Sequence, residues 1–577
     1  MFDEKSLQQD LARARTEGDP DSVTTELRRI GLRVIVEARA DQTLDDVTAS
    51  LREVDERFTV EPLFPEADFE SLPDGEDGVT VLDRHGYVAS LPGVCRLDLT
   101  QNVFDIAAGL KEAGDFARVV PDMPTIDGGR LIGPLEKKAG EPGQNPVTDA
   151  WALKAMKVKE GWEAMSRAPG EGVRIGHPDT GWTNHVEWDA GGLDLSLQRN
   201  FVETDDPGNA RDRLSPGHPG HGTHTAAVMV ARGGIKPDYS GTTPPGRVTG
   251  VATAAKNVPL RAVTNVVIPP GYTEVARAIR YSIEKRLQVI SLSLGGVPMS
   301  LHPDIYHRSV DAVRRNIIMV AASGNYPDWV PPGLRVTVEP AWWNFVIGVT
   351  GSTVEDKPWE SSGRPVGVEI SAPGHQVLTA TGGNRHGYSL GSGTSYATAQ
   401  VAGIAATWLS HHFPGGYRGS REAVHVFKDH LRSTARRPAG WNDYFGPGIA
   451  NLHGLVTTRP PMGKAAVAEE VPEYSHVEAL AHELGAESPE QVEALLDATL
   501  FAELDEAERE PCLIELRTLL WESNAVWQAL TDKVGPSADT ASTAGASEAN
   551  ELRELLAPLA SQGLCDALGL GSPAAAR

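Results

Sequence analysis

Three short motifs that could supply a nucleophilic triad follow one another along the chain. Asp179 stands in Asp-Thr-Gly, His221 in His-Gly-Thr-His and Ser395 in Gly-Thr-Ser. In such a triad the serine attacks a carbonyl carbon, the histidine accepts the serine proton, and the aspartate orients the histidine. Aspartate, histidine, serine is one of the chain orders in which these triads occur. The motifs therefore predict acyl-transfer chemistry.

The residues around each motif predict where it lies in the fold. Residues 173–178 read as a short apolar strand, and sites gather at the carboxyl ends of strands in open α/β sheets. Glycines on both sides of His221 allow a tight turn into a helix. Ser395 begins an alanine-rich helix, whose unpaired N–H groups favour a developing negative charge. Taken singly, these residues also fit plainer roles, a turn aspartate or an N-cap serine.

Taken together, the motifs resemble those of the subtilase family of serine endopeptidases. The family writes its second motif His-Gly-Thr-His-Val-Ala, and its third Gly-Thr-Ser-Met-Ala-x-Pro-His-Val-Ala-Gly. The resemblance covers about residues 145–457. It implies a three-layer α/β catalytic domain with a mostly parallel sheet between helices. The chain departs from the family pattern at Pro178, Tyr396, Ala399 and Gln400, all of which spare the triad residues.

The same resemblance implies an oxyanion site and a substrate-binding cleft. Residues 317–325 match the family's Val-Ala-Ala-x-Gly-Asn, which implies that Asn325 carries the oxyanion-hole amide, with the backbone N–H of Ser395 as second donor. A turn asparagine is the plainer alternative. Val338 is expected to narrow the first specificity pocket. The implied substrate-binding residues form two groups: Ser293, Leu294 and Gly295 on one side of the pocket, and Ala322, Ser323 and Gly324 on the other.

Two other kinds of function compete with a serine endopeptidase. His218, His221 and His224 could form a zinc site, but Gly222 stands where a zincin motif places its catalytic glutamate. The chain could also be a catalytically silent module that binds peptides. Family members often hold structural calcium, yet no acidic calcium loop stands out in the chain. We therefore expect no required cofactor, and no metal in the catalytic site.

Composition limits the compartment and the partners. The 577 residues carry 53 basic and 78 acidic side chains, a formal net charge of −25, which argues against nucleic acid or an anionic membrane as partner. Three widely spaced cysteines imply no disulfide framework. No signal peptide and no apolar run of about 20 residues is found. We expect a cytoplasmic protein, with export by a route without a signal left open.

The flanking sequences predict two further domains around a catalytic domain at 146–457. Within 1–145, strands and helices follow the order β-α-β-β-α-β, a ferredoxin-like plan. Subtilase propeptides share this plan, so the segment is expected to act as an intramolecular inhibitor of a self-processing zymogen; an unrelated α+β domain is the alternative. Residues 458–577 read as an acidic, α-helical extension that either binds a protein partner or only caps the protease, with a last helix at about 548–568.

Overall fold

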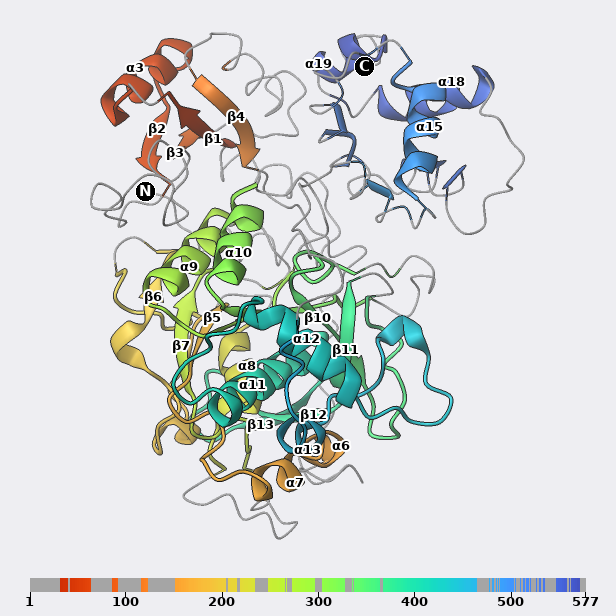
Figure 1. Ribbon diagram of the computed structural model, residues 1–577. Coiled ribbons are helices and arrows are strands. Elements are labelled where there is room, and N and C mark those ends of the chain that lie inside the picture. Colours follow the sequence, from red (N-terminus) through yellow and green to blue (C-terminus); the bar gives the residue numbers. More distant parts are fainter. Residues whose placement is uncertain are drawn as a thin grey trace. The chain divides into compact units, whose positions relative to one another are not determined.

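The computed structural model describes most of residues 151–463 and parts of the flanking segments (Figure 1). In the central part the gaps are 204–205, 215–217, 234–246, 265, 267–271, 296–302, 327–334, 336 and 364–366. Before it, residues 32–39, 42–63, 86–91, 110 and 116–122 are described, and after it scattered residues between 477 and 570. The chain divides into two compact units: Asp127–Val297 with Pro303–Tyr474, and Met1–Ile126 with Pro298–His302 and Ser475–Arg577.

A seven-stranded parallel sheet forms the centre of the larger unit. The strand order is β11-β10-β9-β8-β5-β7-β6, and every neighbouring pair is parallel. Almost every strand residue is buried, as expected for a parallel sheet covered on both faces. The strands are β5 (Arg174–Asp179), β6 (Arg199–Asn200), β7 (Lys256–Arg261), β8 (Val289–Leu292), β9 (Ile318–Ala322), β10 (Ile347–Ser352) and β11 (Val368–Pro373).

Helices cover both faces of this sheet. Successive side chains of a strand point to opposite faces. On β5, a Cβ added to Gly176 would lie 2.7 Å from the hydroxyl of Ser282 in α9 (Tyr272–Glu284), whereas His177 contacts Thr225 in α8 (His221–Val230). The helices α8 and α9 therefore lie on opposite faces. With α11 (Thr394–His412) packed against α8 and α10 (Pro303–Arg314) against α9, the domain has the expected three-layer α/β architecture.

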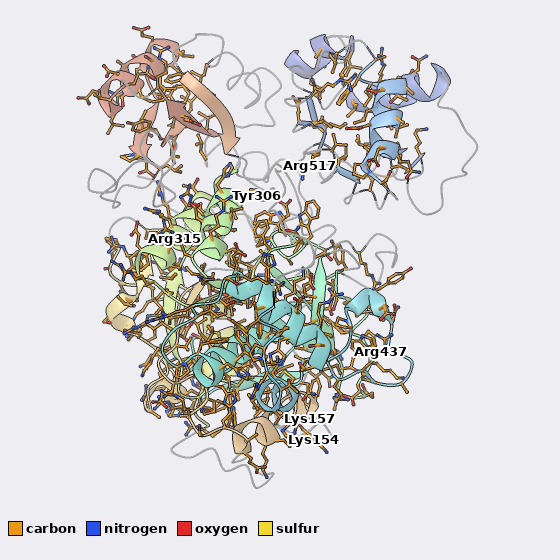
Figure 2. The ribbon with its side chains drawn as sticks, in the orientation of Figure 1. Lys154, Lys157, Tyr306, Arg315, Arg437 and Arg517 are labelled. Carbon is orange, nitrogen blue, oxygen red and sulfur yellow. The ribbon has the colours of Figure 1, made fainter. Side chains whose placement is uncertain are left out.

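The two helices on the α8 face are buried along most of their length. All ten residues of α8 are buried, as are residues 394–410 of α11. Small side chains allow this close packing: a Cβ at Gly403 of α11 would lie 3.0 Å from Val251. In the layer on the opposite face, α10 carries Tyr306, which is labelled in Figure 2. Its ring packs edge-on against the rings of Trp343 and Phe345.

Shorter elements complete this unit. An antiparallel hairpin of β12 (Val377–Ala380) and β13 (Tyr388–Gly391) leads into α11. The remaining elements are α6 (Trp151–Ala155), α7 (Val158–Glu163), α12 (Ala423–Thr434), α13 (Leu452–Thr457) and 3₁₀ turns at Val186–Trp188, Leu195–Leu197 and Asp443–Phe445. In the part of the chain that the structure describes, no helix is long and apolar enough to cross a bilayer.

The N-terminal part contains a four-stranded antiparallel sheet with the order β2-β3-β1-β4. Val34, Val36 and Ala38 alternate along β1 and are fully buried in a hydrophobic core. Thr43 caps α3 through a capping box with Asp46. The elements are β1 (Leu32–Ala38), α3 (Leu44–Val54), β2 (Thr59–Pro62), β3 (Gly86–Leu91) and β4 (Phe116–Asp122). The second predicted helix, at 102–113, lies outside the described residues except for Leu110.

The described elements of the C-terminal part are helical. They are α15 (Pro489–Thr499), α18 (Ala546–Leu556) and α19 (Gln562–Ala567). The prediction of one helix at about 548–568 is wrong, because α18 ends at Leu556 and α19 starts anew. Pro558 lies two residues after Leu556 in the sequence, and a proline disfavours helical continuation across itself and its predecessor.

Candidate active site

Asp179 and His221 form a buried pair. Asp179 is the last residue of β5 and has no exposed surface; His221 is the first residue of α8 and is 1% exposed. The Nδ1 atom of His221 lies 2.9 Å from Oδ1 of Asp179 and 3.0 Å from Oδ2. The backbone N–H of Thr180 donates to Oδ1 at 2.7 Å. The carboxylate thus holds the imidazole with its Nδ1 side toward β5.

Glycines bring the two segments together. Gly181, just after Asp179, has φ +102°, and a Cβ at Gly222 would collide with its carbonyl oxygen. Gly220, just before His221, has φ +79° and lies directly against the backbone of Gly382. A side chain at any of these glycines would clash with the backbone of a neighbouring segment. The absence of side chains there allows His221 to lie close to Asp179.

A second carboxylate, Asp212, ties the same two turns to each other. It accepts hydrogen bonds from the hydroxyl of Thr180 at 2.6 Å and from the backbone N–H of Gly220 at 2.9 Å. Burial raises the pKa of Asp212 although hydrogen bonds from Thr180 and Leu214 act in the opposite direction. No sequence signal pointed to this residue, because its partners come from segments up to 32 residues away.

His177 is a further residue of the site that the sequence reasoning missed. It lies two residues before Asp179 on β5, so both side chains point to the same face. Its Nε2 atom lies 3.3 Å from Oδ2 of Asp179 and 3.1 Å from the hydroxyl of Thr225. The two-residue spacing of a histidine and an aspartate at a strand end is the signal that could have revealed it.

Asp179 stays ionised in this environment. Burial by itself raises the pKa of a carboxyl group, but the charge of His221 and hydrogen bonds from His177 and His221 outweigh it and hold the pKa of Asp179 well below its usual range. A buried carboxylate that keeps its charge can stabilise an imidazolium formed at His221.

Ser395 lies at the start of α11, next to the loop that follows β8. Its hydroxyl donates to the carbonyl oxygen of Ser293 at 3.0 Å, and the hydroxyl of Ser293 donates back to the carbonyl oxygen of Ser395 at 2.9 Å. Ser395 is 6% exposed. Because α8 and α11 pack together, the structure places His221 and Ser395 in the first turns of two neighbouring helices.

The amide of Asn325 is fixed in one orientation beside Ser395. Its Oδ1 atom accepts hydrogen bonds from the backbone N–H of Thr394 at 2.8 Å and from the Thr394 hydroxyl at 2.9 Å. The Nδ2 group is therefore directed away from Thr394. A Cβ built on Gly393 would lie 3.4 Å from this Nδ2 and 3.7 Å from the backbone nitrogen of Ser395. Both donors thus border the same small space.

The residues predicted to bind substrate lie where β8 and β9 end. Ser293, Leu294 and Gly295 follow β8, while Ala322 ends β9 and Ser323 and Gly324 follow it. The backbone N–H of Val338 donates to the carbonyl oxygen of Ser323 at 3.0 Å.

Val338 fills the space between these two segments. A Cβ added to Gly295 would lie 2.5 Å from Cγ2 of Val338, and one added to Gly324 would lie 2.8 Å from Cγ1. The side chain of Val338 is 2% exposed. Its two methyl groups therefore face the glycines on both sides.

The unusual residues near the triad have clear packing partners. The pairing of β5 with β8 involves only Ile175 and Gly176, whereas the pairing with β7 continues past Pro178 to Asp179, so the proline leaves one ladder intact. The amide of Gln400 donates to the carbonyl oxygens of Pro373 and Tyr396.

His218, His221 and His224, the residues of the zinc alternative, all lie among the described residues. Among the residues that the structure describes, no three His, Cys, Asp or Glu side chains are grouped to hold one metal ion. The ring of His218 meets that of His221 edge-on with centroids 6.0 Å apart, while Nδ1 of His221 faces Asp179.

Known proteins are similar in sequence to the central part of this chain. The sequence profile of the subtilase family matches residues 170–448. Subtilisin DY of Bacillus licheniformis is 30% identical over 313 residues, which cover 53% of this chain and 96% of that protein. The chain belongs to the subtilase family.

Other members of the family show the same degree of similarity. The major intracellular serine protease of Bacillus subtilis is 29% identical over 49% of this chain and 81% of its own length. Thermitase of Thermoactinomyces vulgaris is 28% identical over 53% of this chain and 92% of its own length. By family, the chain is a serine protease.

Proposed function

We propose that the chain is a subtilisin-like serine endopeptidase with Asp179, His221 and Ser395 as its triad. The observation that carries this proposal is the buried contact of 2.9 Å between Nδ1 of His221 and Asp179, with Asn325 anchored beside Ser395. The carboxylate orients the imidazole so that Nε2 is left to act as base.

In the proposed reaction, the hydroxyl of Ser395 turns from the carbonyl oxygen of Ser293 toward His221 when a peptide binds. Its oxygen attacks the scissile carbonyl carbon while Nε2 of His221 takes its proton. The Asn325 amide and the Ser395 backbone N–H donate to the oxyanion. The same imidazole then protonates the leaving amine, and water releases the acyl-enzyme by the reverse sequence of steps.

An extended peptide is the proposed substrate. The segments that follow β8 and β9 can pair with its main chain, as peptides do when they add a strand to a sheet edge. Between them, Val338 occupies the floor of the first pocket. A pocket filled in this way favours a small residue, such as alanine, on the acyl side of the scissile bond.

The N-terminal domain is proposed to inhibit the enzyme within the same chain until it is cut off. Its antiparallel sheet of order β2-β3-β1-β4 with its own hydrophobic core supports an independently folding domain. We further propose a cytoplasmic location, which agrees with the intracellular relative. We also propose that the C-terminal helices bind a protein partner.

Hydrolysis of peptides by the purified chain tests the proposed activity. The wild type and Ser395→Ala are incubated with a peptide library and their own masses are followed. We expect wild type to cleave peptides and to lose an N-terminal fragment, and Ser395→Ala to do neither. If both proteins stay whole, and wild type remains inactive after the N-terminal domain is removed, the alternative of a silent peptide-binding regulator is favoured.

A further inference from the structure

Asp179 lies between two histidines. On one side, His221 contacts both carboxylate oxygens; on the other, His177 approaches Oδ2 at 3.3 Å. Both histidines are 1% exposed, so water does not screen these contacts. A carboxylate in a triad needs only one imidazole to orient, and the proposed mechanism leaves His177 without a task.

The surroundings of His177 indicate where its proton lies. Its Nε2 faces a carboxylate oxygen and the hydroxyl of Thr225, and that hydroxyl lies 3.0 Å from the carbonyl oxygen of His221, which can only accept. The hydroxyl has two acceptors, this carbonyl at 3.0 Å and Oδ2 of Asp179 at 3.4 Å, and it donates to the nearer carbonyl. Its lone pairs are then left for the proton on Nε2 of His177. With its proton on Nε2, His177 shares this N–H between Asp179 and Thr225.

We infer that His177 is a positioning residue that tunes the basicity of His221 through Asp179. This inference rests on the proposed function of the triad. A hydrogen bond donated to Asp179 disperses part of its negative charge. The carboxylate then attracts a proton on His221 less strongly, so His221 stays neutral, and able to act as a base, down to lower pH.

Other charged or titratable groups lie near Asp179 and His221, and a substitution of His177 leaves them in the chain. His218 lies edge-on to His221, and His224 follows one turn later on α8. From β7, Arg261 donates to the carbonyl oxygen of Thr180 and pairs with Glu203, with Asp212 3.9 Å away. These groups are the same in wild type and in a His177 variant. The difference in the pKa of His221 between those two proteins therefore isolates the effect of His177.

A histidine NMR titration tests the inference without relying on catalysis. The full chain carrying Ser395→Ala is labelled at the histidine rings, and the signal of His221 is assigned by its loss in His221→Gln. We expect His177→Leu to raise the pKa of His221 by about 0.5–1 unit, because Asp179 loses a donor. We expect His177→Gln to keep the pKa near that of wild type, because its amide can donate from a similar position.

Two controls separate tuning from a change in packing. His425→Leu removes another buried histidine, on α12, and is expected to leave the pKa of His221 unchanged. If His177→Leu does not fold, His177→Asn replaces it, since its shorter amide is polar but ends short of Asp179. An unchanged pKa of His221 in the folded His177 variant, or an equal shift in His425→Leu, overturns the inference.

The pH profile of peptide hydrolysis then connects the inference to activity. In the chain with Ser395 intact, the acid limb of kcat/KM should move to higher pH in His177→Leu by the same amount as the NMR pKa. If wild type proves inactive while the NMR shift is found, the proposed function fails and the tuning by His177 stands. If activity is found without a shift in either measurement, only the inference about His177 fails.

Discussion

At the scale of single residues, each polar side chain of the candidate site is fixed by a hydrogen bond to a neighbouring residue. Thr394 holds the oxygen side of the Asn325 amide, and Asp179 holds the Nδ1 side of His221. Ser293 holds the hydroxyl of Ser395 in its resting position. In the proposed reaction, such anchoring would let the donors face a developing charge without reorganising.

Replacing Asn325 by Ala tests the proposed oxyanion site. We expect kcat to fall about 10²–10³-fold with little change in KM, the magnitude known for the loss of such a donor in subtilisin itself. Steady-state kinetics on a peptide substrate measure both constants. Asn344→Ala, which removes an exposed amide, serves as the control and should leave kcat unchanged. A fall in kcat of similar size in both variants would contradict the role of Asn325.

Replacing Val338 by Gly tests the proposed pocket floor. Removing the side chain opens space between Gly295 and Gly324, which its methyl groups now fill. We expect kcat/KM for phenylalanine on the acyl side of the bond to rise relative to alanine by about tenfold or more. Val338→Ala should give an intermediate ratio. A ratio that stays at the wild-type value in Val338→Gly would show that Val338 does not limit the pocket.

At the scale of elements, the site gathers where three parallel strands end and two helices begin. Asp179 ends β5, while Ser293 and Asn325 follow β8 and β9. His221 and Ser395 lie in the first turns of α8 and α11. The carboxyl edge of the sheet thereby brings together residues from positions 179 to 395 of the chain.

Replacing Gly222 by Ala tests how closely β5 and α8 must approach. The added Cβ would collide with the carbonyl oxygen of Gly181, which belongs to the turn just after Asp179. A misplacement of about 1 Å at the site can cost on the order of 10²-fold in rate, and we expect a loss of at least this size in kcat/KM. Gly208→Ala is the matched control, since its Cβ would meet no atom within 4 Å. Unchanged kinetics in Gly222→Ala would contradict the assigned role.

The sequence predicted those parts of the site that depend on local signals. The glycine-rich turns and the apolar strand at residues 173–178 are visible in a few consecutive letters, and the structure brings Asp179 and His221 together there. Asp212 could not be predicted, because its role arises from two turns that meet only in the folded chain. The two-residue spacing of His177 and Asp179 on β5 is also a local signal, because it places both side chains on one face of the strand. The prediction of one helix at about 548–568 is wrong, and Pro558 supplies the local reason, since a proline disfavours helical continuation.

At the scale of the whole molecule, the protease domain is flanked by two segments that its family match at 170–448 does not cover. The N-terminal part has its own core, which includes Val47 and Leu51 of α3 packed on the β1 face. The chain as a whole carries a formal net charge of −25.

Inhibition by the N-terminal domain is the prediction at this scale. Residues 1–145 are separated from the rest by an introduced cleavage site and purified. Added back in excess, they are expected to abolish peptide hydrolysis by the remaining chain, because a propeptide-like domain would occupy the substrate cleft. A denatured sample of the same segment is the control. Hydrolysis that continues at full rate in the presence of the folded segment would count against an inhibitory role.

The central claim is that Ser395 is an activated nucleophile, and covalent labelling by a fluorophosphonate tests it most directly. The probe is applied to the folded chain freed of its N-terminal domain, and the labelled residue is located by peptide mass mapping. We expect one label on Ser395, much slower labelling in His221→Ala, and none in Ser395→Ala. Folded wild type that remains unlabelled, or a label on another serine that persists in Ser395→Ala, would contradict it.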